Sequence, residues 1–179
     1  MGWQQKIQAR DAGAGGVKVQ YGALCWRDGG KGVEVLLITS RDTGRWVIPK
    51  GWPMPGLAPE AAAAQEAWEE AGVHGQINPC CIGRFGYQKC LSASTAIPCA
   101  VAVYGLRVES LASSFPEMKE RRRKWFPLDE AAALVAEPEL SRIIAGFTPP
   151  KDGRPAPIAA EDDDAAPDPR LGDGKGRGH

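Results

Sequence analysis

Three glutamates, Glu66, Glu69 and Glu70, lie close together in an alanine-rich stretch that favours an α-helix. Glu66 and Glu70 are one helical turn apart and Glu69 lies beside both, so the three carboxylates share an arc of about 100° on one helix face. Like charges at this spacing are normally offset by Lys or Arg one turn away, yet residues 51–83 contain neither. Hard divalent cations, which prefer oxygen ligands, suit such a face. The alternative is an ordinary solvated acidic face.

The loop before this helix favours the metal-binding interpretation. Gly51 ends a predicted strand and is followed by two prolines and Gly56. Because proline fixes the backbone, this loop is expected to expose carbonyl groups in a fixed geometry close to the helix. Lys50, immediately before it, can meet a phosphate group. The loop and the helix together therefore indicate a site for a metal ion and a phosphorylated ligand.

The spacing of these residues resembles the signature of the Nudix family, which reads G-x5-E-x7-R-E-U-x-E-E-x-G-U, where U is apolar. The chain has Gly51 and, at the expected interval, the run Gln65-Glu66-Ala67-Trp68-Glu69-Glu70-Ala71-Gly72-Val73. The flanking segments WVIPKG and KWFPLDEA also resemble the family, so that the resemblance covers roughly residues 17–147. The layout is most similar to the branch that hydrolyses diphosphoinositol polyphosphates and dinucleoside polyphosphates.

The resemblance implies Mg²⁺-dependent hydrolysis (Mn²⁺ being possible) of a pyrophosphate bond in a small phosphorylated molecule. The expected substrate is a nucleoside-diphosphate-linked or polyphosphorylated compound, above all diadenosine polyphosphate or diphosphoinositol polyphosphate. Glu66, Glu70 and the Gly51 carbonyl are the implied metal ligands. Glu69 is a ligand or the general base, and Glu66 is the other candidate for the catalytic role. Glu117 and Glu120 are candidates for a further ligand.

Two positions depart from the signature. Leu57 stands where the family has its first glutamate, and Gln65 stands where it has arginine. Gln65 can donate a hydrogen bond to Glu66 but cannot pair its charge, so the departures imply a lower rate rather than loss of the metal. They also leave open a catalytically weak Nudix-fold module that binds a phosphorylated ligand. An enzyme acting on nucleoside triphosphates or ADP-ribose is a third interpretation.

Substrate phosphates require cationic side chains, and several precede or follow the helix. The residues expected to bind substrate are Lys50, Arg45, Lys18 and Arg41, with Arg84 and Lys89 as further candidates. The densest basic cluster, residues 121–124, either clamps a polyphosphate or covers the surface. Trp52 and Tyr87 are candidates for stacking on a base, with core packing or an exposed loop as the alternative.

These residues must be positioned by an α+β fold, and the resemblance implies a mixed β-sheet sandwiched between α-helices. Hydropathy alternation predicts strands at residues 17–26, 33–39, 45–48, 82–88, 97–108 and 125–126, and helices at 59–71, 128–136 and 141–147. Pro59 should open the first helix and Gly72 should end it. Within that helix, Ala61, Ala64, Trp68 and Ala71 are expected on the face opposite the glutamates.

Composition limits the remaining possibilities. The net charge is zero, with 22 residues of each sign, so overall charge does not indicate a nucleic acid polymer or a membrane as partner. Neither a signal peptide nor a membrane span is recognisable, and the five cysteines form no metal motif, so a cytoplasmic protein is expected, either a monomer or a homodimer. We expect a flexible leader at 1–16, a hydrolase domain at 17–147 and a disordered tail at 148–179.

Overall fold

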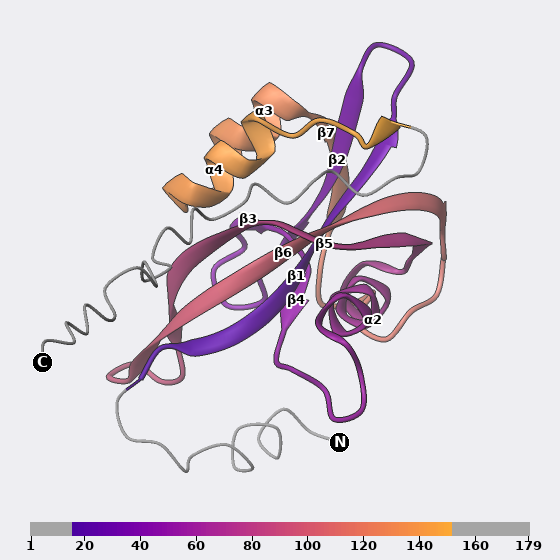
Figure 1. Cartoon of the computed structure of the whole chain (residues 1–179). Coiled ribbons are helices and arrows are strands. Elements are labelled where there is room, and N and C mark those ends of the chain that lie inside the picture. The colour runs from indigo at the N-terminus through magenta and orange to yellow at the C-terminus, as the bar shows by residue number, and fades with distance from the viewer. Residues whose placement is uncertain (1–15, 152–179) are drawn as a thin grey trace, which may run out of the picture.

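The computed structural model describes residues 16–151, which fold as a mixed β-sheet between helices (Figure 1). This arrangement confirms the predicted α+β class. The elements, in chain order, are β1 (Lys18–Asp28), β2 (Val33–Thr39), β3 (Trp46–Val47), β4 (Lys50–Gly51), α2 (Pro59–Ala71), β5 (Val73–Cys90), β6 (Ala96–Leu111), β7 (Arg123–Pro127), α3 (Leu128–Leu134) and α4 (Pro138–Ala145).

The sheet has the strand order β3-β2-β1-β6-β5, while β4 pairs with β1 and β7 pairs with β2. β1 and β6 run parallel, and all other pairs are antiparallel. β2 has the predicted bounds. β5 is much longer than the predicted strand at 82–88, because its pairing with β6 continues through shifts in register near Gly75 and Cys81. Long-range pairing therefore extends a strand through glycine and proline positions that interrupt the local pattern.

Alternate residues of β1 point to opposite faces of the sheet, as the two-residue period of a strand requires. Leu24 and Trp26 pack into one core with α3 and α4. Ala23 and Cys25 pack into a second core with the alanines of α2. Figure 1 shows α2 on one side of the strands and the α3–α4 pair on the other. Both faces of the central strands are thus covered, which explains why they are apolar throughout.

The ends of α2 lie where the sequence predicts them. Pro59 occupies the first turn, and Gly72 ends the helix in the left-handed conformation with φ of 66°. A side chain at this glycine would be strained and would also collide with the ring of Phe115. These two residues therefore fix the length of the helix that carries the glutamates.

The buried face of α2 differs from the prediction. The buried residues are Ala62, Ala63, Glu66, Ala67, Glu70 and Ala71, whereas Trp68 is half-buried and stacks on His74 with ring centroids 4.5 Å apart. Ala71 is buried on the face predicted opposite the glutamates, but Glu66 and Glu70 are buried as well, whereas hydropathy places glutamates toward solvent. Small alanines instead let the helix lie close to the sheet, so that Glu66 and Glu70 turn inward with them.

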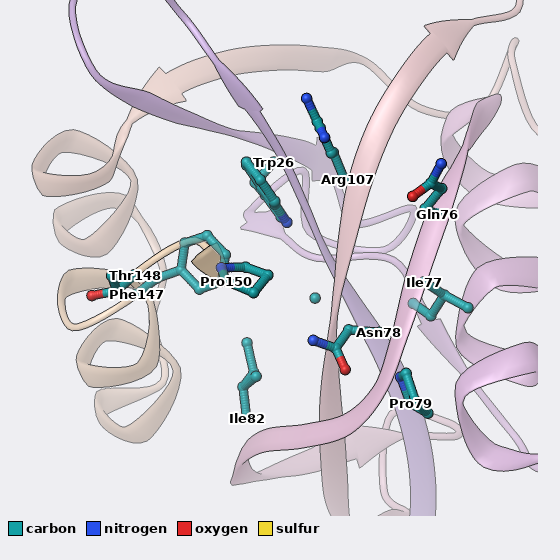
Figure 2. Close-up of a pocket in the computed structure, with 11 residues that line it drawn as sticks. Trp26, Gln76, Ile77, Asn78, Pro79, Ile82, Arg107, Phe147, Thr148 and Pro150 are labelled. Carbon is teal, nitrogen blue, oxygen red and sulfur yellow. The ribbon is translucent and has the colours of Figure 1, made fainter. Parts of the chain in front are cut away.

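The end of the described chain packs on the α3–α4 side of the sheet. The ring of Phe147 lies against Trp26 at 5.7 Å between centroids, and Thr148 and Pro150 line a cavity of about 150 Å³ with Ile82 and Asn78 (Figure 2). Residues 148–151 thus have defined contacts. The remainder of the predicted tail, residues 152–179, and nearly all of the predicted leader lie outside the described residues.

Shortening the chain to residue 151 should leave the thermal midpoint unchanged, because residues 152–179 offer almost no large apolar side chains. Shortening it to residue 146 should lower the midpoint by a few degrees, since the contact of Phe147 with Trp26 is lost. Differential scanning calorimetry of both shortened chains checks this. A large drop for the chain ending at residue 151 would show that the removed segment packs on the domain.

No helix among residues 16–151 is long and apolar enough to cross a membrane.

Candidate active site

A cleft of about 150 Å³ forms where β1, β4 and β5 meet the loop after β2 and the end of α2. Its charged lining consists of the cations Arg41, Arg45, Lys50, Lys89 and Arg121 and the acids Asp42, Glu70 and Glu137. Its polar and aromatic lining includes Gln20, Ser40, Thr43, Tyr87, Gln88 and Cys90. Three of the four predicted substrate-binding residues, Arg41, Arg45 and Lys50, therefore lie together. Lys18, Arg84 and Trp52 lie outside this lining.

Glu66 is buried against the backbone of β4. A Cβ atom added to Gly51 would overlap the Glu66 carboxylate, so glycine is needed for this side chain to keep its place. Gly51 is held in place by antiparallel pairing with Tyr21 of β1. The glycine at the start of the motif thus has a clear physical role, because it lets the first glutamate of the helix approach the loop backbone.

Glu70 is also buried and receives two hydrogen bonds. The backbone N–H of Lys50 donates to Oε2 at 3.3 Å, and Nη2 of Arg121 donates to Oε1 at 3.2 Å. Burial raises the pKa of Glu70 to about 7, although Arg121 and Lys50 act in the opposite direction. The expectation that the glutamates have no counter-charge holds only for the local sequence, because Arg121 comes from a point 51 residues further along the chain.

Arg121 is a structural partner of Glu70 as well as part of the cleft wall. Its guanidinium also donates to Glu117 Oε1 at 3.3 Å and to the Thr39 carbonyl at 3.1 Å, and its side chain is 9% exposed. Arg123 donates to the carbonyl groups of Ala71 and Ala112. Much of the basic cluster at 121–124 therefore ties the segment before β7 to α2 and β2.

Replacing Arg121 by glutamine should lower the free energy of unfolding by about 2 kcal/mol in metal-free buffer, because buried Glu70 loses a charged donor. Arg122→Gln is the matched control, since Arg122 is exposed and its backbone alone bonds to Thr39. Urea unfolding of both variants measures the difference. Equal losses in the two variants would contradict a stabilising pair between Arg121 and Glu70.

Glu69 is half-buried and accepts a hydrogen bond from Nε2 of Gln65 at 3.2 Å. The predicted partner of Gln65 was Glu66, one residue away. The difference follows from the helix itself, because residues four apart lie on the same face whereas adjacent residues do not. Gln65 therefore orients the glutamate that is a candidate for the general base.

Glu117 and Glu120, the candidates for a further metal ligand, lie in the segment between β6 and β7. Nη1 of Arg41 is 3.4 Å from a carboxylate oxygen of each. Glu117 in addition pairs with Arg121. Both acids thus neutralise arginines at the edge of the cleft, and their role as metal ligands stays a prediction.

The buried glutamate pair fits a small hard cation. Among residues 16–151, no three acidic, histidine or cysteine side chains converge as a ready cage for a metal ion. Mg²⁺ does not require one, since proteins commonly hold it through one or two carboxylates, water and substrate phosphates. Glu66 and Glu70 offer two buried carboxylates, and the Glu66 carboxylate lies against Gly51, whose carbonyl is the predicted third ligand. The donor set consists of oxygen atoms, as Mg²⁺ and Mn²⁺ prefer.

Lys50 is the cation whose backbone N–H bonds to Glu70. It is half-buried, and its Nζ lies 5.0 Å from the centre of the Tyr87 ring. Burial lowers the pKa of Lys50, while Glu70 acts in the opposite direction. The Tyr87 hydroxyl donates to Gln20 Oε1 at 2.5 Å, so the ring is fixed beside the ammonium group. Of the two predicted stacking residues, Tyr87 therefore lies in the cleft wall.

Two buried polar residues of the cleft, Gln20 and Glu137, were not among those predicted from the sequence. Gln20 is 2% exposed near the start of β1, and a polar residue on the strand face that also carries Leu24 and Trp26 is the signal that could have revealed it. Glu137 precedes Pro138 at the start of α4, where an acidic residue is so common that sequence offers no distinguishing signal.

Comparison with known proteins agrees with this arrangement. The model of the NUDIX domain matches residues 18–147. Nudix hydrolase 16, mitochondrial, of Arabidopsis thaliana is 32% identical over 125 residues, which are 67% of this chain and 68% of that protein. Diphosphoinositol polyphosphate phosphohydrolase 3-beta of Homo sapiens is 27% identical over 164 residues, covering 87% of this chain and 96% of that protein.

A solved structure shares the fold. The Ap4A hydrolase of C. elegans, in a binary complex, superimposes with a TM-score of 0.54 at 21% identity, covering 72% of this chain and 93% of that one. Because the family match spans the sheet, α2 and α4, and the relatives that share it are hydrolases, the chain belongs to the Nudix family and is a pyrophosphohydrolase.

Proposed function

We propose that the protein hydrolyses, with Mg²⁺, a pyrophosphate bond in a nucleoside-diphosphate-linked or polyphosphorylated small molecule. Diadenosine polyphosphates and diphosphoinositol polyphosphates are the leading candidates. The observation that carries the proposal is the pair of buried carboxylates, Glu66 and Glu70, between Gly51 and a cleft lined by arginine and lysine. Mn²⁺ is expected to replace Mg²⁺, since the same oxygen ligands suit both.

Each group has a distinct part in this chemistry. Glu66, Glu70 and the Gly51 carbonyl hold the metal ion, which when bound neutralises phosphate charge and lowers the pKa of water. Lys50 and Arg45 bind phosphate oxygens and keep the reacting phosphorus in place. Glu69, held by Gln65, or Glu66 takes a proton from the attacking water. The water adds to phosphorus as the bridging oxygen leaves with one phosphate-containing fragment.

A screen of the purified protein with Mg²⁺ tests this proposal. The substrates are diadenosine polyphosphates, diphosphoinositol polyphosphates, nucleoside triphosphates and ADP-ribose, and the products are resolved by ion-exchange chromatography. We expect turnover of at least one of the first two classes and none in excess EDTA. Full turnover in EDTA would contradict the metal-dependent mechanism.

The second candidate is a module that binds a phosphorylated ligand and has lost most of its activity. Gln65 in place of arginine and the exposed Leu57 in place of glutamate favour it. Tight binding of one of these phosphorylated compounds without turnover would favour the binding module over the enzyme. Turnover of nucleoside triphosphates or ADP-ribose alone would instead support the third interpretation.

Lys50→Ala should lower kcat/KM by about tenfold, mainly through a higher KM, because the cleft loses a half-buried cation. The thermal midpoint should change little, as Lys50 contributes its backbone N–H to Glu70 and that bond remains. Steady-state kinetics with Lys31→Ala, an exposed turn residue, as control measures the effect. Unchanged kinetics in Lys50→Ala would show that the Lys50 side chain does not bind substrate.

All five cysteines, which lie in the described part of the chain, are free thiols. We propose a reducing compartment such as the cytoplasm on this ground. The mitochondrial designation of the Arabidopsis relative makes imaging of a tagged full-length chain the appropriate test. Both a monomer and a homodimer are compatible with the proposed activity.

A further inference from the structure

Glu137 lies between α3 and α4 and contributes to the cleft wall although it is almost fully buried. Its side chain is 8% exposed, and its Oε1 lies 3.9 Å from Arg45 Nη1, too far for a hydrogen bond. Within residues 16–151, its Oε2 is the one buried side-chain oxygen or nitrogen without a hydrogen-bond partner. A buried carboxylate oxygen without a donor costs free energy, so this atom requires an explanation.

Local structure does not supply that explanation. Glu137 stands at the N-cap position of α4, but its side chain makes no capping hydrogen bond. Its backbone carbonyl already accepts the N–H of Ser141. Arg45 is 49% exposed and donates through Nε to Thr43, so it pairs only weakly with Glu137. The carboxylate therefore retains acceptor capacity at the wall of a cleft that binds ligand.

We propose that Glu137 accepts a hydrogen bond from an amino or hydroxyl group of a nucleoside, and so marks the part of the cleft that holds the nucleoside of the substrate. This inference rests on the proposed function and names the class of substrate. An ionised carboxylate can only accept hydrogen bonds, and it repels phosphate oxygens. The terminal torsion of glutamate is broad, so a rotation can exchange its two oxygens and turn either one toward the donor.

The cleft offers groups of opposite preference to the two ends of a substrate. Lys50 lines the cleft together with Glu70, which lies next to the proposed metal site. Phosphates are expected there, where cations and the metal ion neutralise them. Glu137 has the opposite preference, since its acceptor oxygen suits a neutral N–H or O–H group. A ligand that carries phosphate at one end and a nucleoside at the other satisfies both.

The preference of Glu137 for neutral donors distinguishes the two leading substrate classes. A diphosphoinositol polyphosphate carries phosphate on nearly every ring oxygen, so it brings anionic oxygens and few neutral donors to Glu137. A dinucleoside polyphosphate brings ribose hydroxyls and the amino group of a base. The buried acceptor at Glu137 therefore favours dinucleoside polyphosphates over diphosphoinositol polyphosphates.

Binding to non-cleavable probes tests the inference without turnover. Adenosine and guanosine 5′-monophosphates and inositol hexakisphosphate contain no pyrophosphate bond, and their affinities can be measured by isothermal titration calorimetry. We expect Glu137→Gln to weaken binding of at least one nucleotide by about tenfold and to leave inositol hexakisphosphate unchanged or tighter. Glu139→Gln, which removes the same charge from an exposed position in α4, is the matched control and should change neither.

Nucleotide analogues that each lack one donor group identify the group that bonds to Glu137. They are measured with the wild-type chain, so this test does not depend on the folding of Glu137→Gln. Purine riboside 5′-monophosphate lacks the amino group of adenosine monophosphate, and the 2′-deoxy and 3′-deoxy nucleotides each lack one hydroxyl. One of these losses should weaken binding by about tenfold. In turnover assays, Glu137→Gln should lower the ratio of kcat/KM for diadenosine tetraphosphate to that for a diphosphoinositol polyphosphate.

Several outcomes would overturn the inference. They are equal changes for nucleotide and inositol phosphate in Glu137→Gln, equal affinity for all the analogues, or no binding of either nucleotide to the wild-type chain. Nucleotide binding that depends on Glu137, with no turnover of any pyrophosphate substrate, would uphold the subsite and contradict the proposed activity. The two proposals therefore fail separately.

Discussion

Replacing Glu66 and Glu70 together by glutamine should lower turnover at least about a hundredfold, the scale of losing several kcal/mol of transition-state stabilisation. Both carboxylates are buried, Glu70 in the cleft wall and Glu66 against Gly51, and glutamine keeps their shape while removing two charges. Added Mg²⁺ should raise the melting temperature of the wild-type chain and not that of the variant, because only a bound ligand shifts the folding equilibrium.

The same variant should be as stable as the wild-type chain, or more stable, in metal-free buffer above pH 7. The pKa of Glu70 is raised from 4.5 to about 7 by burial, so the folded chain binds its proton more tightly than the unfolded chain does. Stability from this group is therefore present at low pH and is lost as pH rises through about 7. Glutamine, which resembles the neutral acid, avoids that loss.

A matched control removes two charges from exposed positions away from the cleft. Glu130→Gln with Glu139→Gln changes exposed glutamates of α3 and α4 and should leave both turnover and the response to Mg²⁺ intact. Steady-state kinetics and scanning calorimetry with and without EDTA measure all three chains. Retained turnover in the Glu66 and Glu70 variant would place the chemistry elsewhere, and a strongly destabilised metal-free variant would show that these side chains hold the fold.

Gly51→Ala should lower turnover about a hundredfold, since displacing a catalytic group by about 1 Å can cost that much. The added methyl group would occupy the space of the Glu66 carboxylate, and this glutamate would have to move away from the loop backbone. The free energy of unfolding should change less than turnover does, because the overlapping atoms are the end of a flexible side chain that can move aside.

Gly105→Ala is the control for this change. Gly105 is buried in β6, but a Cβ atom there would lie 3.7 Å from Phe147 and 3.9 Å from Trp26, which are ordinary contacts. Its turnover should match that of the wild-type chain. Kinetics at saturating Mg²⁺ and urea unfolding of both variants give the comparison. Full activity in Gly51→Ala would mean that Glu66 does not need its place against the loop.

Features of local structure and motif spacing could be predicted from the sequence. Pro59 and Gly72 mark the ends of α2 because proline suits a first turn and glycine suits the left-handed residue that ends a helix. β2 has its predicted bounds because its apolar run is buried on both faces. The spacing from Gly51 to Gly72 pointed to the family, since the signature is a pattern of intervals along the chain that can be read without the fold.

Only the tertiary structure decided what surrounds the glutamates. The sheet and loop turned Glu66 and Glu70 inward with the small alanines, against the hydropathy of the helix. Arg121 reaches Glu70 from 51 residues away, and Glu137 enters the cleft from the start of α4. Such pairings depend on how distant elements pack, and local propensity carries no information about them. The sequence by itself thus determined the family and the helix that carries its glutamates, whereas packing determined which charges compensate these carboxylates and which buried acceptor lies in the cleft wall.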